Sequence, residues 1–403
     1  MFHKRAFLIC LCVGCLLWAG LSLNAHRTAF AQQPPTAAPT STPLDVPEVP
    51  LGGLFERTLP IAAGYTDPTD TNQIAVTVRF TAPDASTFDL PAFWMQPQQA
   101  ACDENCANEV ITPTGAAAWM LRFRPTQVGE WLYTVEARTP ANVQIVTAGR
   151  LRVVPAKQQG TIQLGRNGRY FSTGEGKPFF PVGVNLAWSW SGAGNTRGYI
   201  TWLDQLAQAG ANYARLYVDV PWFIGFGWHS PAGSMAAAQS SAWRLDSVLR
   251  AAEERGIALQ LVLVWHQGWI TYSDPPYNPP TTPARATTSA DWSINPHNLR
   301  RGGAFSTATA FFTSEDGRRL FRDRLRYMVA RWSYSSSLFA WELVDQLDRL
   351  TPSNNTLAAE WAAEMISYLR AVDPYRHLVT LGVRDASNIA LARALNLDFA
   401  QVR

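Results

Sequence analysis

The chain has two regions that differ in the spacing of their hydrophobic residues. From residue 54 to residue 155, short runs such as Ile74–Phe80 and Ala118–Arg124 alternate apolar and polar residues, with turn residues between them. From residue 179 onward, short runs that are apolar throughout are followed by longer segments with apolar residues at helical spacing. The first period is that of half-buried β-strands, and the second pattern is that of buried parallel strands followed by amphipathic helices. We therefore expect two domains of different fold class.

The alternating region predicts a β-sandwich over residues 54–156. Several short strands within roughly 100 residues, with turn signals between them, are typical of the immunoglobulin-like (Ig-like) topology. Residues Gly129–Glu136 add a further alternating strand after a turn that contains Pro125. No cluster of titratable residues appears in this region, so we expect it to support its neighbour or to contact a glycan rather than to carry out chemistry.

The second region, residues 157–403, predicts an α/β domain with a parallel sheet. Alternating strands and helices give parallel sheets with right-handed crossovers. A complete eight-stranded TIM-type (β/α)8 barrel takes about 250 residues, so we expect an incomplete barrel in which about six of the eight strands are present. Strands are predicted at 179–188, 212–220, 257–266, 338–346, 378–381 and 397–402, and helices at 199–210, 242–255, 317–332 and 357–372.

The first 31 residues have the order of a secretory signal peptide. Lys4 and Arg5 precede the apolar run Ala6–Leu23, and small residues at Ala29 and Ala31 provide a cleavage site. An uncleaved anchor remains the alternative, because the run is nearly long enough to span a bilayer. We expect cleavage, with no stable membrane span afterwards and a secreted, extracellular or cell-envelope location. Residues 32–53 are rich in Pro, Thr and Ala and predict an extended linker.

Composition excludes some functions and leaves two cysteines to explain. The formal charge of +3 is small for 403 residues and no basic stripe recurs along a helix, so we expect no nucleic-acid partner. The 16 Trp residues suit stacking on sugars, but Trp is also a common core residue. After cleavage only Cys102 and Cys106 remain, and in an oxidising compartment they predict a disulfide. A metal site is the less favoured alternative, because no further ligands cluster nearby.

Polar residues follow the predicted parallel strands at the ends where a barrel of this kind carries its chemistry. Aromatic residues in the following loops would form a rim, as a sugar cleft requires, since each ring is stacked while its hydroxyls are hydrogen-bonded. The predicted strand-end residues are Asn185, Trp188, Arg215, Asp219, Trp265, His266, Asp345, Gln346 and Arg403, and the loop residues are Trp190, Trp222, Trp228, Trp269, Tyr272, Tyr277 and Trp292.

Residues 179–403 resemble the cellulase-type glycoside hydrolases of family 5 and their clan A relatives, in the bacterial subgroup with an Ig-like N-terminal domain. The matching stretches are Pro181–Trp188, Asn212–Leu216, Ala242–Asp246, Arg324–Trp332, Ala340–Leu343, Tyr375–Thr380 and Leu397–Gln401. The resemblance implies a retaining mechanism with two glutamates about 5 to 5.5 Å apart, an acid after strand four and a nucleophile at strand seven. It also implies that Arg215 and His266 hold the substrate, and that neither a cofactor nor a metal is needed.

The chain departs from the family pattern at the catalytic positions. Asp345 and Gln346 stand where the family has an Asn-Glu pair, Arg403 stands where it commonly has a His, and strand seven is not among the predicted strands. An amide cannot donate a proton as a carboxylic acid does, and loss of general-acid help typically lowers rates by about 10² to 10⁴. Among substitute carboxylates, Asp345 is a weak candidate, and Glu342 is better explained as a paired core group.

We therefore expect a secreted glycoside hydrolase-like protein that acts on or binds β-linked polysaccharide, with impaired or absent hydrolysis, and leave open whether it is an enzyme. The alternative is a non-catalytic glycan-binding or cell-surface scaffold protein. The expected partners are a carbohydrate and a C-terminal fragment that completes the barrel.

Overall fold

The computed structural model describes residues 46–62, 64–103, 106, 108–157, 160–187, 195–221, 223–228, 233–270, 291–350, 355–384 and 389–402. The predicted signal peptide, most of the predicted linker, and Trp188, Trp190, Trp222, Tyr272, Tyr277 and Arg403 lie outside these ranges.

The N-terminal region forms two β-sheets that pack face to face. In β3 (Ala75–Thr81), Val76, Val78 and Phe80 point into the core and the residues between them do not, as the alternating pattern predicts. Phe123 of the opposite sheet stacks on Phe80 with ring centroids 4.1 Å apart. One sheet has the order β1 (Glu48–Pro50), β10 (Val143–Val154), β9 (Gly129–Arg138), β3 and β4 (Thr87–Pro91), and the other has the order β2 (Phe55–Thr58), β8 (Ala118–Phe123) and β5 (Phe93–Met95).

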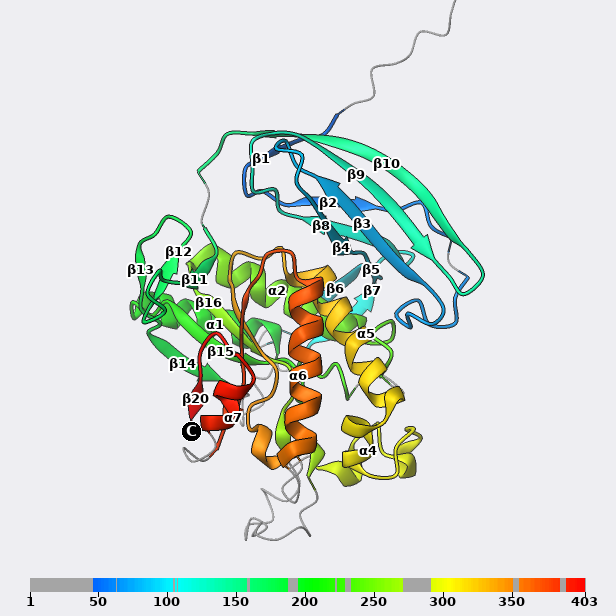
Figure 1. Cartoon of the computed structure of the whole chain (residues 1–403), viewed down its shortest axis with the longest axis vertical. Coiled ribbons are helices and arrows are strands. Elements are labelled where there is room, and N and C mark those ends of the chain that lie inside the picture. Colours follow the sequence, from blue (N-terminus) through cyan, green and yellow to red (C-terminus); the bar gives the residue numbers. More distant parts are fainter. Residues whose placement is uncertain are drawn as a thin grey trace, which may run out of the picture. The chain divides into compact units, whose positions relative to one another are not determined.

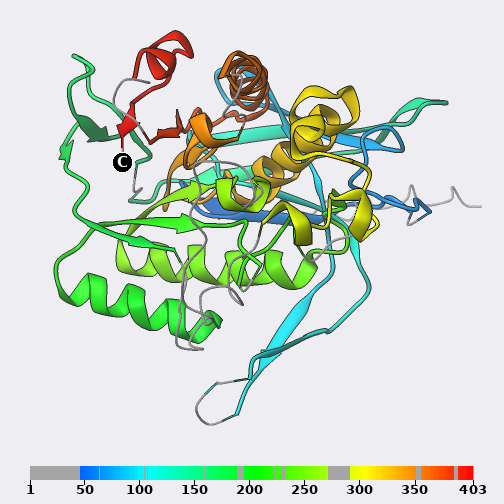
Figure 2. The same cartoon turned by 90° about the horizontal axis from the view of Figure 1, so that it is seen from below.

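The sandwich begins earlier than the predicted boundary at residue 54. Strand β1 lies within the segment predicted as linker, and it pairs in parallel with β10 through Glu48 and Arg152, Val49 and Val153, and Pro50 and Val154. Val49 is buried, which explains why this short segment adds to the sheet. Strands β6 (Gln98–Ala101) and β7 (Val110–Pro113) form a separate hairpin, the long cyan arm in Figure 2.

A small antiparallel sheet connects the two regions. It consists of β11 (Ile162–Leu164), β12 (Phe171–Thr173) and β13 (Pro178–Phe179). Phe171 and Phe179 pack on Phe339 with ring centroids 5.0 and 5.9 Å away, near the N-terminal ends of the parallel strands. The strand predicted at 179–188 is therefore divided between β13 and β14 (Gly183–Leu186), with Pro181 between them, since proline cannot donate to a ladder.

The C-terminal region is built on a parallel sheet. Its strand order is β14, β15 (Tyr213–Tyr217), β16 (Ala258–Val262), β17 (Leu338–Glu342) and β18 (Leu378–Thr380), and all four pairings are parallel. A further parallel pair joins β19 (Gly382–Val383) to β20 (Gln401–Val402), the last predicted strand. Figure 1 shows how these strands and helices are arranged.

Helices follow the strands at the predicted places. The long ones are α1 (Thr196–Gln208), α2 (Gln239–Arg255), α5 (Glu315–Trp332) and α6 (Asn355–Val372). The short ones are α4 (Ala308–Thr313), α7 (Ile389–Ala394), η2 (His266–Trp269), η3 (Trp292–Ile294), η4 (Leu299–Arg301) and η5 (Leu347–Arg349). Gly256 ends α2 in the left-handed conformation, φ 66°, which glycine adopts without strain.

A buried charge network joins the sandwich to α2 and α5. Asp246 of α2 accepts from Arg122 of β8 at 2.8 Å and from Arg331 of α5 at 2.7 Å. The Trp332 indole donates to the same carboxylate at 2.8 Å. Burial alone would raise the pKa of Asp246, but Arg122 and Arg331 outweigh it and hold the pKa below its ordinary value. The two regions are therefore joined by paired charges in their common interior.

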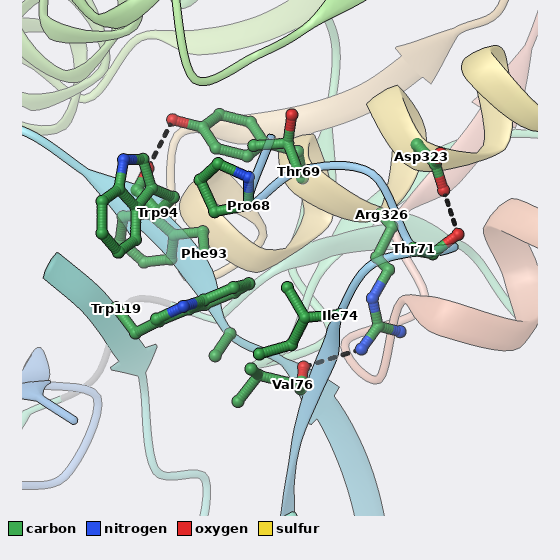
Figure 3. A pocket seen from close by; sticks show the side chains of 12 residues that line it. Pro68, Thr69, Thr71, Ile74, Val76, Phe93, Trp94, Trp119, Asp323 and Arg326 are labelled. Atoms are coloured by element: carbon green, nitrogen blue, oxygen red, sulfur yellow. Dashed lines mark hydrogen bonds between the residues drawn. The ribbon is translucent and has the colours of Figure 1, made fainter. Parts of the chain in front are cut away.

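A cavity of about 20 Å³ lies beside this junction, between the sandwich and α5 (Figure 3). Thr71 donates to Asp323 at 2.6 Å, Tyr327 donates to the Trp94 carbonyl at 3.0 Å, and Arg326 donates to the Val76 carbonyl at 2.7 Å. This volume is that of about one water molecule, so the cavity cannot admit a sugar ring. The candidate site has to be sought at the strand ends.

Candidate functional site

Two strands of the parallel sheet bring Arg215 and Glu342 together. Arg215 of β15 donates from Nε and Nη2 to the two Glu342 carboxylate oxygens of β17, at 2.6 and 2.5 Å. Glu342 is fully buried, and Gln260 of β16, the strand between them, donates to it at 2.6 Å. Complete burial raises the pKa of Glu342, and the bonds from Arg215 and Gln260 oppose that rise. Glu342 is thus the paired core group that the sequence favours.

A second pair lies at the strand ends. The His266 ring Nδ1 lies 2.8 and 2.9 Å from the two Asp345 carboxylate oxygens, and the His266 backbone N–H donates to Asp345 Oδ1 at 2.8 Å. Both side chains are buried, at 4% and 1% exposure. Asp345 therefore holds the imidazole in one orientation, and the two predicted site residues are in direct contact.

Tyr217 connects the two pairs. Its hydroxyl accepts from Arg215 Nη1 at 2.7 Å and donates to Asp345 Oδ2 at 3.2 Å, while Arg215 Nη1 also reaches Asn185 Oδ1 at 3.2 Å. Burial and the neighbouring Asp345 charge raise the pKa of Tyr217. Tyr217 is not among the site residues predicted from the sequence. Its position two residues after Arg215, on the same face of β15, was the signal available.

Gln346 lies immediately after this network. It is half-buried, whereas its neighbour Asp345 is buried, and its side chain does not cap η5, which follows. Strand β17 ends at Glu342, and the next three residues, which end with Asp345, are all buried. Gln346, which the sequence predicts at the acid position, is thus the more accessible of the two.

Of the aromatic residues predicted at the strand ends and in the loops, the structure describes Trp228, Trp265, Trp269 and Trp292. Trp265 and Trp269 are each 2% exposed, so they are core residues in this structure and cannot stack on a sugar. The ring of Trp269 lies 4.4 Å from Phe311 and 5.7 Å from Trp292, which is also buried. Trp228 is half-buried and packs against the small cluster that contains Trp265. The residues that surround these rings are distant in sequence, so the burial of the rings could not be predicted from the positions of the strand ends.

Asp219 belongs to a separate buried cluster. Arg324 of α5 lies 3.1 Å from its carboxylate, and the Gly227 backbone N–H donates to it at 3.0 Å. His297 lies nearby, and burial, with a smaller contribution from Arg324, lowers its pKa from 6.5 to about 4. These contacts explain Asp219 as a structural carboxylate.

The structure also bears on the cysteines and on two other kinds of site. Cys102 and Cys106 form a disulfide with Cα atoms 4.7 Å apart. In the ranges that the structure describes, no group of three or more His, Cys, Asp and Glu side chains could hold a metal ion. Within the same ranges, no helix combines the length and the apolar character that crossing a bilayer requires.

Comparison with known proteins gives results for both regions. Residues 53–138 match the family described as "Domain of unknown function (DUF5060)". Mannan endo-1,4-beta-mannosidase A of Podospora anserina is 25% identical over 218 residues, 52% of this chain and 51% of that protein. Mannan endo-1,4-beta-mannosidase A of Hypocrea jecorina is 26% identical over 138 residues, 34% of this chain and 26% of that protein. The chain thus spans about half or less of the length of these curated relatives.

A solved structure extends the comparison to both regions together. A candidate glycoside hydrolase from Bacteroides vulgatus ATCC 8482 superimposes with a TM-score of 0.54 at 16% identity, over 84% of this chain and 57% of that chain. At this identity the match establishes a shared fold. The relatives by sequence are mannan endo-1,4-beta-mannosidases and the neighbour by structure is described as a glycoside hydrolase, in agreement with the resemblance carried by the sequence motifs.

Proposed function

We propose that this protein is a secreted glycoside hydrolase-like protein that binds β-linked polysaccharide of the mannan type, with hydrolysis impaired at Gln346. The observation that carries the proposal is the strand-end network of Arg215, Tyr217, Asp345 and His266, followed directly by Gln346. This buried network fixes the carboxyl ends of the parallel strands, and the half-buried Gln346 beside it can hydrogen-bond a sugar hydroxyl. The mannosidase relatives favour mannan over other β-linked polymers.

Impaired hydrolysis follows from the chemistry at the acid position. A glycosidic oxygen is a poor leaving group unless a carboxylic acid protonates it. Asp345 is adjacent, but its two oxygens are engaged by His266 and Tyr217 in the buried network. Gln346 can donate an amide hydrogen bond to the polymer without transferring a proton.

Binding is tested by titrating the full chain with a β-1,4-linked mannan oligosaccharide while following Trp fluorescence. We expect a saturable change with mannan and a weaker one with the matching β-1,4-glucan oligosaccharide. His266→Ala should weaken mannan binding, while Glu136→Gln, at a half-buried position of strand β9 in the sandwich, serves as a control and should not. If the folded wild-type protein shows no change in Trp fluorescence with mannan, the proposed function is contradicted.

Hydrolysis is tested with nitrophenyl β-mannoside and with mannan. We expect no release of reducing ends from mannan by the wild-type chain, because Gln346 cannot protonate the leaving oxygen. Nitrophenolate leaves without that proton, so release of nitrophenol with no release from mannan would locate the defect at the acid position. Turnover by the wild-type that disappears in Gln346→Ala would show that the amide takes part in catalysis and would refute the proposed impairment.

A further inference from the structure

Glu109, in the loop that joins β6 to β7, contacts two helices of the other region. Its side chain is 4% exposed and forms an ion pair with Arg244 Nε of α2 at 2.9 Å. Its other carboxylate oxygen accepts from the backbone N–H of Thr196, the first residue of α1, at 3.0 Å. A carboxylate at a helix N-terminus is favoured because the first N–H groups of a helix lack intrahelical partners.

The disulfide loop of the same hairpin makes a second contact with α1. The Cys106 carbonyl accepts from the side-chain amide of Asn195, and Asn195 caps α1 by accepting from the Gly198 N–H at 2.7 Å. Asn195 and Cys106 are both buried, at 8% and 2% exposure. Two groups from the sandwich, a carboxylate and a carbonyl, therefore fix the start of α1.

From Glu109 the contacts continue to the ends of β14 and β15. Arg244 donates to the Phe223 carbonyl at 2.8 Å, and Phe223 follows β15 in the chain. The Phe223 ring stacks on Tyr199 of α1 with centroids 3.7 Å apart and planes inclined by 6°. The Tyr199 hydroxyl donates to the carbonyl of Ala187, the residue after β14, at 3.3 Å. This path leads to the strands that carry Asn185, Arg215 and Tyr217.

We propose that Glu109 is a positioning residue through which the N-terminal sandwich fixes the segments that follow β14 and β15, and so sets the affinity of the strand-end network for polysaccharide. The inference rests on the proposed function for its ligand, but its structural part does not. A carboxylate with two partners and almost no exposure is held in one geometry, and removing its charge leaves Arg244 without its partner. The backbone should then become more mobile at Ala187, Phe223 and Tyr199.

The decisive variant is Glu109→Gln in the full chain. Glutamine keeps the size and can still accept from Thr196, but it cannot pair with the Arg244 charge. We expect faster amide hydrogen exchange in residues 195–199 and 223–227, and a loss of mannan-oligosaccharide affinity of about fivefold or more. Arg244→Gln should also lower the affinity, and the two changes should not add, because Arg244 carries the next link of the same path, the bond to the Phe223 carbonyl.

A matched control separates positioning from general loss of stability. Val78→Ala removes volume from the sandwich core far from the hairpin contacts and should lower the unfolding temperature while leaving sugar affinity unchanged. Equal loss of affinity in Val78→Ala and Glu109→Gln would overturn the proposal. So would unchanged exchange and unchanged affinity in Glu109→Gln.

The exchange measurement needs no ligand, so the two proposals can fail separately. If the wild-type binds no polysaccharide, the proposed function fails, and exchange alone decides whether Glu109 positions these segments. If the wild-type binds and Glu109→Gln binds equally well, only the positioning role fails. The double variant Cys102→Ser, Cys106→Ser tests the second contact, with faster exchange expected at residues 195–199.

Discussion

Two buried arginine–carboxylate networks in this molecule differ in how fully the carboxylate is compensated. At the junction of sandwich and helices, Asp246 accepts from two guanidinium groups and an indole, and its pKa lies below the ordinary value. At the strand ends, Glu342 accepts from one guanidinium and one amide, and its pKa lies above the ordinary value. The first arrangement stabilises the ion, whereas the second leaves a carboxylate whose burial is only partly offset. We infer that the first network joins domains and that the second holds Arg215 in place.

Removing the Asp246 charge should have the largest effect. Asp246→Asn leaves Arg122 and Arg331 buried without their counter-charge, so we expect a loss of about 4 kcal/mol in the free energy of unfolding. Urea denaturation followed by Trp fluorescence measures it. The deficit relative to wild-type should shrink as pH falls below about 4, because a lowered folded pKa gives stability that is present above the unfolded pKa and lost on acidification. A deficit that does not change with pH would contradict the charge argument.

Acid should also destabilise a third buried cluster, in which His297 lies near Arg324 and Asp219. His297, between Arg324 and the Trp269 ring, has its pKa lowered from 6.5 to about 4, so the unfolded chain binds its proton first as pH falls. Its neutral form therefore contributes stability above pH 6.5 that is lost towards pH 4, roughly 3 kcal/mol for this difference in pKa. Urea midpoints of wild-type and His297→Phe at pH 7 and pH 4.5 measure it. We expect the variant to lose less stability between the two values, and parallel losses would show that His297 is not responsible.

Neutralising Glu342 should cost less than neutralising Asp246 and should show the opposite dependence on pH. Glu342→Gln keeps one oxygen for Arg215, and we expect a loss of about 2 kcal/mol at pH 4. A raised folded pKa gives stability that is fully present below the unfolded pKa and lost as pH rises through the folded value. The deficit of this variant should therefore shrink from pH 4 to pH 8, as measured in urea. A deficit that grows over this range would show that Arg215 dominates over burial.

Gln346→Ala should have the smallest effect on folding. The side chain is half-buried and does not cap η5, so we expect a change within about 0.5 kcal/mol in the urea experiment. A larger loss would show that Gln346 belongs to the buried network.

The sequence predicted what depends on local periodicity. The alternation at Ile74–Phe80 is the core-facing pattern of β3, and Gly256 ends α2 as its chemistry requires. Polar strand ends at Arg215, His266 and Asp345 are brought together, because neighbouring parallel strands present their carboxyl ends at one edge.

Features that depend on contacts across the chain could not be predicted in the same way. Trp265 was predicted at a strand end and Trp269 in the loop rim, but Trp265 is buried in a cluster with Tyr217 and Trp269 packs on Phe311, both of which are distant in sequence. The pairing of Asp345 with His266 depends on the relative register of β16 and β17, which no local pattern encodes. The contact between Cys106 and Asn195 likewise joins two segments that have no sequence signal in common.

The Arg122 network also constrains the order in which the chain can fold. Its bonds connect residue 122 to Asp246, 124 positions later, and to the Arg331 carbonyl, 209 positions later. During synthesis the sandwich strands emerge from the ribosome well before α2 and α5. The sandwich can form its own core at that stage, but the Arg122 guanidinium must stay hydrated until both helices dock. The N-terminal region therefore completes its folding only when the C-terminal region does, and cutting the chain between them would leave a surface adapted to a missing neighbour.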